Sequence, residues 1–238
     1  MFNSFAAIYA VLPQVAHRDL FIVISLILVV ILAVTKVTFP LLFVESFSLG
    51  RLFGFRVKED LGSNIRPFST EHIFFTALYS FILAFVALFM INQLADSGPD
   101  LSLLMVDSFG QGFLLWLILG VGFNLLAYLK YLLIAITGWL FHARPLVNKH
   151  FIDYINASSL FYLLVSIVLS LTIYSTFIVG ETFSLVVIFT IFIFLFYRSL
   201  LMYVKLLQLS PYSKLYIFSY ICTTELIPVL IALKFLTT

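Results

Sequence analysis

Long apolar runs constrain this chain of 238 residues more than any other feature of its sequence. Six stretches reach the length of about 20 residues that a helix needs to cross a bilayer. They lie at residues 20–44, 72–91, 113–141, 158–179, 183–203 and 214–236. Only 10% of the residues are charged, against about 25% in soluble domains, which is too few to cover a water-facing surface. We therefore expect a protein embedded in lipid.

The apolar runs predict helices rather than the strands of a barrel. Residues 21–24 and 188–192 do not alternate apolar with polar side chains, as the strands of a membrane barrel do. Backbone N–H and C=O groups in lipid have no water to bond, and a helix satisfies them within one segment. The predicted fold class is all-α, a polytopic transmembrane helical bundle of about six spans. Residues 1–19 precede the membrane domain, which we place at residues 20–236.

The positions of lysine and arginine predict how the bundle is oriented. Basic residues gather in three alternate loops and their flanks, and the other two loops contain only acidic charges. The basic residues are Arg51, Arg56, Lys58, Arg66, Arg144, Lys149, Arg198, Lys205 and Lys214. The acidic ones are Asp96, Asp100, Asp107 and Glu181. Because cytoplasmic loops are enriched in lysine and arginine, we expect both termini to lie outside the cytoplasm.

The segment before the first span contains no basic residue in residues 1–16, so it is not expected to be a cleavable signal peptide. Its apolar side chains recur at near-helical spacing up to Pro13. Two interpretations remain open. The segment is either a short amphipathic helix on the outer membrane surface or a loosely packed tail.

Two of the basic loops are expected to contact lipid headgroups. Arg51, Arg56 and Lys58 alternate with apolar side chains in the loop between the first two spans. Such residues gain about 1 kcal/mol each near an anionic membrane surface. Arg144 and Lys149 occupy the corresponding loop after the third span. The alternative for the first loop is a docking surface for a partner protein.

Sequence motifs for catalysis are missing. The chain has no Gly-rich phosphate loop, no GxSxG, no HExxH and no paired Asp motif. His142 and His150 lie eight residues apart with no further ligand, so we expect no metal site. The single cysteine, Cys222, has no second thiol. A net charge of +2 gives no reason to expect a nucleic-acid partner, and we expect no cofactor. The sequence favours a non-enzymatic protein.

Lys36, Lys130 and Glu225 are the charged residues that fall well inside the apolar runs, where charges are costly and often functional. Lys36 is expected to extend its side chain to the cytoplasmic headgroups. Lys130 has two interpretations. We favour the one in which it marks the inner boundary of its span, with residues 131–141 along the interface and Trp139 as an anchor. In the other, Lys130 is buried against a partner.

Glu225 is the most informative residue because it lies near the middle of the last span and must face the bundle. Pro228 lacks the N–H that would bond the carbonyl of Thr224, which leaves a free carbonyl beside an acid. A neutral Glu225 would lock the packing by donating to a carbonyl or to Asn124. Alternatively, Glu225 gains and loses a proton or cation as the bundle moves, and Lys130 is a candidate partner.

The C-terminal residues 216–228, followed by Lys234, resemble the C-terminal signature of the DUF4271 family, a group of uncharacterised multi-span membrane proteins from Bacteroidota. Lys130-Tyr131 followed by Trp139-Leu140-Phe141 is similar to the middle segment of that family. The resemblance implies a bacterial inner membrane and a family pattern that includes Lys130, Glu225 and Pro228. It implies no activity.

The function that the sequence favours is a non-enzymatic inner-membrane subunit or scaffold of a cell-envelope assembly, export or motility system. Its partners would be the lipid bilayer and other membrane or envelope proteins. The alternative is a small transporter or proton-coupled component centred on Glu225. A lipid-modifying enzyme is least favoured, because the sequence offers no credible nucleophile or metal cluster.

Overall fold

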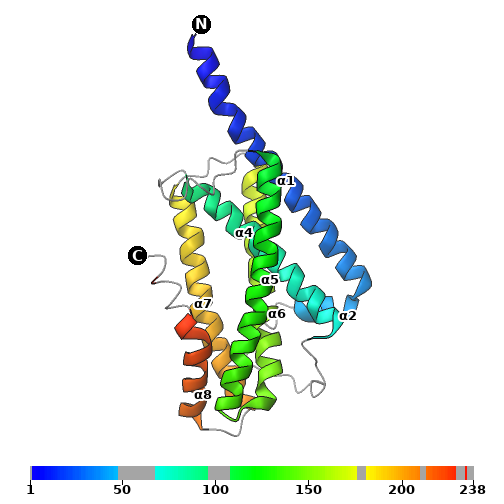
Figure 1. Cartoon of the computed structure of the whole chain (residues 1–238), viewed down its shortest axis with the longest axis vertical. Coiled ribbons are helices and arrows are strands. Elements are labelled where there is room, and N and C mark those ends of the chain that lie inside the picture. The colour runs from blue at the N-terminus through cyan, green and yellow to red at the C-terminus, as the bar shows by residue number, and fades with distance from the viewer. Residues whose placement is uncertain are drawn as a thin grey trace.

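The chain folds as an elongated bundle of helices (Figure 1). The computed structural model describes residues 2–47, 68–95, 108–175, 181–209, 213–228 and 234, and no strand occurs among them. The helices are α1 (Phe2–Thr38), α2 (Pro40–Ser46), α4 (Thr70–Ala95), α5 (Phe109–Leu140), α6 (Arg144–Tyr174), α7 (Glu181–Leu209) and α8 (Lys214–Ile221). A π-helix, η3 (Cys222–Leu226), continues α8. The predicted all-α bundle is confirmed.

Five helices in the described part of the chain are long and apolar enough to cross a membrane. These candidate spans are Arg18–Thr38, Thr70–Gln93, Phe109–Leu140, Arg144–Tyr174 and Phe183–Gln208. They correspond to the first five predicted spans and indicate a membrane protein in contact with lipid. The sixth predicted span, residues 214–236, is described only up to residue 228 and at residue 234.

The fourth helix starts much earlier than the sequence predicts, at Arg144 rather than residue 158. The polar residues between these two positions are typical of a loop in sequence terms. In the structure they belong to α6 and lengthen it by more than three turns. A tight turn precedes it. His142 has φ 50, and Ala143 N–H donates to the Gly138 carbonyl at 2.8 Å, which closes the end of α5 in a Schellman arrangement. A side chain at Gly138 would overlap Val147.

Prolines and hydroxyl side chains set several other helix ends. The backbone breaks at Phe39, and Pro40 occupies the first turn of α2. Ser69 accepts a hydrogen bond from the N–H of His72 at 3.4 Å and so caps the start of α4. The N-terminal segment is part of one continuous helix that runs through Pro13 and projects beyond the bundle (Figure 1).

The core forms around α4, which packs against α1, α5, α6 and α7. Its residues Ile82, Phe85 and Leu88 are fully buried. Gly120 of α5 lies directly against the ring of Phe81, so the two helices approach closely. Small residues at helix contacts are typical of membrane bundles, where close van der Waals packing replaces the hydrophobic driving force.

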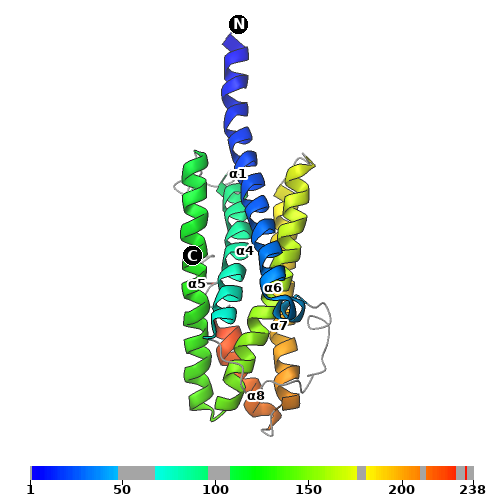
Figure 2. The same ribbon diagram turned by 90° about the vertical axis from the view of Figure 1, so that its right-hand side faces the viewer.

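Most of the described basic residues lie toward one end of the bundle. The α5–α6 turn and the start of α8 are at the lower end in Figures 1 and 2, whereas α5 and α7 begin at the upper end. Arg144 is exposed at the lower end and Lys149 is partly buried. Lys205 is buried near the end of α7, and Arg198 is buried and pairs with Glu225 instead of flanking a loop as the sequence interpretation assumes. The predicted headgroup contacts Arg51, Arg56 and Lys58, like Arg66, lie outside the described residues.

Candidate functional site: a buried ion cluster

The carboxylate of Glu225 is the centre of a buried cluster of ionisable side chains from four parts of the fold. Its side chain is fully buried. Oε1 lies 3.1 Å from Lys130 Nζ of α5 and 3.4 Å from His150 Nε2 of α6. Oε2 accepts a hydrogen bond from Arg198 Nη2 of α7 at 3.1 Å. We call Glu225, Lys130, His150 and Arg198 the ion cluster.

The local backbone around Glu225 follows from Pro228. Proline has no N–H and its ring crowds the carbonyl four residues earlier, which is that of Thr224. The helix widens here, since Ile227 N–H donates to the Cys222 carbonyl five residues back. Lys130 Nζ donates a hydrogen bond to the Thr224 carbonyl. The carbonyl that the sequence predicts to be free is therefore satisfied by the same ammonium that pairs with Glu225.

Arg198 is held on three sides. Besides its bond to Glu225, Nη1 donates to the hydroxyl of Ser158 at 2.9 Å. The guanidinium carbon lies 4.2 Å from the centre of the Tyr154 ring, and Lys130 Nζ lies 5.4 Å from the same ring. Tyr154 thus contributes cation–π contacts to both cations, and such contacts strengthen in a site without water.

His150 connects Glu225 to a second polar group. Its Nδ1 lies 2.9 Å from the hydroxyl of Tyr220, on the opposite side of the ring from Glu225. Both His150 and Tyr220 are buried. The ring of Phe141, at the α5–α6 turn, packs 6.1 Å from Tyr220 and 5.3 Å from Tyr216. The hydroxyl of Tyr216 donates to the Phe141 carbonyl.

The ion cluster contains more basic than acidic groups. Arg198 stays protonated in proteins, and an ammonium at Lys130 adds a second positive charge against the single carboxylate of Glu225. Charges buried at membrane depth are costly, and they persist where they pair with one another. The arrangement can therefore hold an anionic carboxylate strongly, and any loss of that negative charge leaves two cations facing each other.

The position of Lys130 differs from the one that we favour from the sequence, in which it marks the inner boundary of its span. The helix α5 continues without a break to Leu140, and the ammonium of Lys130 faces Glu225 instead of marking a span boundary. This is the buried alternative. Its physical reason is that two acceptors, the carboxylate and the Thr224 carbonyl, lie within reach of one ammonium.

Asn124 is not among the described residues that contact Glu225. Its side-chain nitrogen is buried without a hydrogen-bond partner in the structure.

Lys36, the third charged residue inside the apolar runs, is exposed on α1 and lies outside the ion cluster.

Sequence reasoning missed two members of the ion cluster. Arg198 lies inside the predicted fifth span, residues 183–203, so its position within an apolar run is a signal that identifies it as an intramembrane charge. His150 gives no such signal, because the polar residues around it are typical of a loop. Within the described residues, no group of three or more His, Cys, Asp or Glu side chains is placed to share a metal ion.

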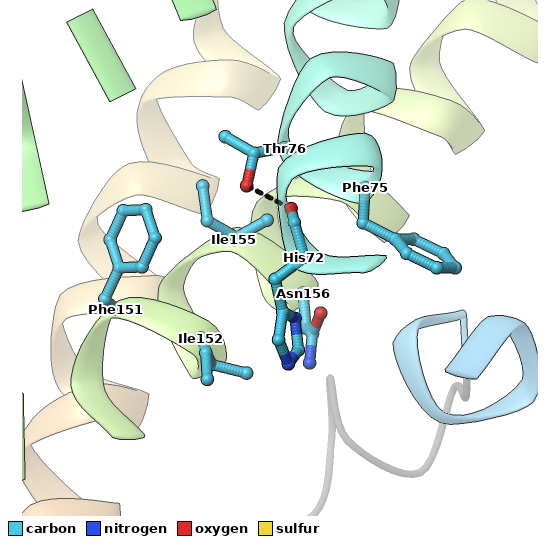
Figure 3. A pocket seen from close by; sticks show the side chains of 7 residues that line it. All are labelled: His72, Phe75, Thr76, Phe151, Ile152, Ile155 and Asn156. Atoms are coloured by element: carbon cyan, nitrogen blue, oxygen red, sulfur yellow. Dashed lines mark hydrogen bonds between the residues drawn. The ribbon is translucent and has the colours of Figure 1, made fainter. Parts of the chain in front are cut away.

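A small pocket lies between the first turns of α4 and the first half of α6 (Figure 3). It has room for about one water molecule. The side chains of His72 and Asn156 lie side by side at its edge, and Thr76 donates to the His72 carbonyl at 2.8 Å. The remaining lining is apolar: Phe75, Phe151, Ile152 and Ile155. The size and lining suit a structural water.

Comparisons with known proteins connect the chain to one protein family. No curated protein and no solved structure matches the chain. One family model, described as a domain of unknown function, matches residues 20–236, which include every member of the ion cluster. The match covers nearly the whole chain, and the chain belongs to the DUF4271 family.

Proposed function

We propose that the protein is a proton-coupled component of a bacterial inner membrane, in which Glu225 gains and loses a proton as the helices move. The observation that carries the proposal is the ion cluster itself. One buried carboxylate is shared by basic side chains from α5, α6 and α7. Ionisable groups inside a membrane bundle are functional sites by default, because their burial is costly.

The charge balance supports a site that changes state over a pair that only locks the packing. A structural ion pair needs one acid and one base, and Arg198 with Glu225 already forms that pair at 3.1 Å. Lys130 and His150 add basic groups that such a pair does not require. When Glu225 binds a proton, Lys130 and Arg198 repel each other. Protonation therefore favours a different arrangement of α5 and α7.

The test is whether Glu225 titrates in the folded protein. We expect the infrared difference spectrum between acidic and neutral pH, measured in lipid nanodiscs, to contain a protonated-carboxyl band that Glu225→Gln removes. Glu71→Gln is the matched control, because Glu71 is an exposed residue at the start of α4 and outside the ion cluster. Absence of a Glu225 band at every pH at which the protein stays folded would contradict the proposal.

A second candidate is a subunit or scaffold of a cell-envelope assembly, export or motility system. The outer face of α5 supports it. Exposed apolar residues follow that face at helical spacing over most of its length: Leu114, Ile118, Val121, Leu125, Leu129, Leu132, Ile136 and Leu140. Lipid covers such a face in a solitary protein, and a partner helix covers it in a complex.

Purification in mild detergent separates the two candidates. A subunit is expected to retain a membrane or envelope protein in fixed stoichiometry. A proton-coupled component that works alone is expected to be solitary and to show the Glu225 band in that state. The assignment to Bacteroidota belongs to the same proposal and is supported by the resemblance of residues 216–228 to the family signature.

A further inference from the structure

We propose that His150 and Tyr220 form the route by which protons reach and leave Glu225, and that this route opens toward the α5–α6 turn. The inference rests on the proposed function, because it assumes that Glu225 titrates. It adds the groups through which a proton reaches Glu225 and the end of the bundle from which the proton enters. The argument depends on which neighbours of Glu225 are able to pass a proton.

Two of the three basic neighbours of Glu225 act only as hydrogen-bond donors when they are protonated. The guanidinium of Arg198 cannot be deprotonated in proteins and has no acceptor. The ammonium of Lys130 has three donors and no acceptor, and one of them is bound to the Thr224 carbonyl. His150 differs, since a neutral imidazole has one nitrogen that donates and one that accepts. Among these three groups, only His150 is able to accept a proton on one side while it donates one on the other side.

The geometry of His150 suits a relay. Nε2 lies 3.4 Å from Glu225 Oε1, and Nδ1 lies 2.9 Å from the Tyr220 hydroxyl. The imidazole therefore bridges the carboxyl and the phenol. Nε2 has no aligned hydrogen bond in this arrangement, so a small approach of Glu225 would complete the chain. A catalytic hydrogen bond that is long at rest commonly tightens when the group acts.

The remaining charged and titratable groups near Glu225 come from α4, α5, α6 and α7. Lys130 faces Glu225 from α5, Tyr154 from α6 contacts both cations, and Arg198 faces Glu225 from α7. Tyr79 of α4 and Tyr162 of α6 interact electrostatically with Arg198. Neither exchanges a proton with Glu225 through Arg198, because a guanidinium keeps its protons.

The proton transfer balances without a further reactant except water. During loading, a hydronium ion gives a proton to the Tyr220 oxygen while the Tyr220 hydroxyl proton moves to His150 Nδ1. The Nε2 proton of His150 moves to Glu225 Oε1. Tyr220 remains a neutral phenol and His150 remains neutral, with its proton on Nδ1 instead of Nε2. Unloading by the same route reverses each transfer, so the imidazole ring never has to rotate.

The position of Tyr220 gives the direction of the route. It precedes Glu225 by five residues, so at about 1.5 Å per residue it lies roughly 7 Å nearer the start of α8. That start lies at the same end of the bundle as the α5–α6 turn (Figure 2). Phe141 of the turn packs against Tyr220.

The experiment is a rapid pH change on the protein in lipid nanodiscs, with the Glu225 carboxyl band followed in time. Removal of a general acid–base group typically slows a proton transfer by about 100-fold, so we expect that effect for His150→Gln. We expect Tyr220→Phe to slow the band as well, because it removes the hydroxyl and keeps the ring. Tyr203→Phe is the control, since Tyr203 contacts Phe218 of α8 outside the relay, and it should keep the normal rate.

The outcomes separate this inference from the proposed function. A normal rate in both His150→Gln and Tyr220→Phe would overturn the route and leave the titration of Glu225 intact. Absence of the band in the unsubstituted protein would overturn the proposed function itself. If His150→Gln fails to fold, Tyr220→Phe decides alone, because phenylalanine preserves the contacts of the Tyr220 ring with His150 and Phe141.

Discussion

At the scale of single residues, the charges of the ion cluster decide how each substitution affects stability. Lys130→Met leaves Arg198 and Glu225 as a pair of opposite charges at 3.1 Å. Glu225→Gln leaves Lys130 and Arg198 without a negative partner in a buried site. The two substitutions each remove one charge, but only the second leaves buried charge uncompensated.

We therefore expect Glu225→Gln to lower the free energy of unfolding by about 3–5 kcal/mol, the range observed when one partner of a buried pair is removed. Lys130→Met should cost less. Combining the two should recover about 1–3 kcal/mol relative to Glu225→Gln alone, because one of the two unpaired cations is gone. Unfolding of the three variants in the same detergent measures these values. Strict additivity would show that the 3.1 Å contact between Lys130 and Glu225 carries no energy.

At the scale of helices, the π-helix η3 places Glu225 in the ion cluster. The missing N–H of Pro228 favours this wider turn. An alanine at position 228 regains an N–H for the Thr224 carbonyl and removes a residue that costs about 3 kcal/mol within a helix. We expect Pro228→Ala to convert η3 to an ordinary α-helix. That change rotates Glu225 relative to Lys130.

The expected result is slower amide hydrogen exchange at residues 222–228, together with a Lys130–Glu225 coupling energy below about 0.5 kcal/mol in a double-mutant cycle. Unchanged coupling would mean that Lys130 and not Pro228 maintains the wide turn. Lys130 is able to maintain the wide turn because its ammonium donates a hydrogen bond to the Thr224 carbonyl.

The contact between α4 and α5 offers a second test with a control only two residues away. A Cβ at Gly120 would overlap the ring of Phe81, which is held by Trp116 through packing and a hydrogen bond from Nε1 to the Phe81 carbonyl at 3.2 Å. A Cβ at Gly122 would meet nothing within 4 Å. We expect Gly120→Ala to destabilise the protein by about 1–3 kcal/mol. Gly122→Ala should be neutral or slightly stabilising, and equal effects in thermal unfolding would contradict the observed packing.

At the scale of the whole molecule, the helices alternate in direction, and this alternation gives a test of orientation. Ser108 begins α5 at one end of the bundle, and Ser213 precedes α8 at the other (Figure 1). Single cysteines at these positions, in a Cys222→Ser background, should react with a membrane-impermeant reagent from opposite sides. The positive-inside rule predicts that Ser213 faces the cytoplasm. Labelling of both cysteines from one side would contradict a bundle that crosses the membrane.

The same orientation would place the opening of the proposed proton route on the cytoplasmic side, because Tyr220 lies on α8, which begins after Ser213 at that end of the bundle. The orientation now rests on fewer residues than the sequence suggests. Arg198 belongs to the ion cluster, so the described members of the predicted cytoplasmic set that still carry the argument are Arg144, Lys149, Lys205 and Lys214.

The sequence by itself determined the membrane class, the helices and the place of an acid, Glu225, inside the last apolar run. These features are local. An apolar run of about 20 residues is a span wherever it occurs in the chain. A proline at position 228 frees the Thr224 carbonyl whatever surrounds it. The start of α6 differs from the sequence prediction, because the polar residues before position 158 are typical of a loop but lie on a helix.

Only the tertiary structure decided which groups meet Glu225. His150 is 75 residues away along the chain, Lys130 is 95 and Arg198 is 27. Their meeting depends on how α5, α6 and α7 are rotated and shifted along their axes. Helices that are apolar on nearly every face carry little periodic signal for that rotation, in contrast to the amphipathic helices of soluble proteins. Close packing at positions such as Gly120 and Gly138 fixes the rotation, and pairwise packing appears only when the helices are assembled.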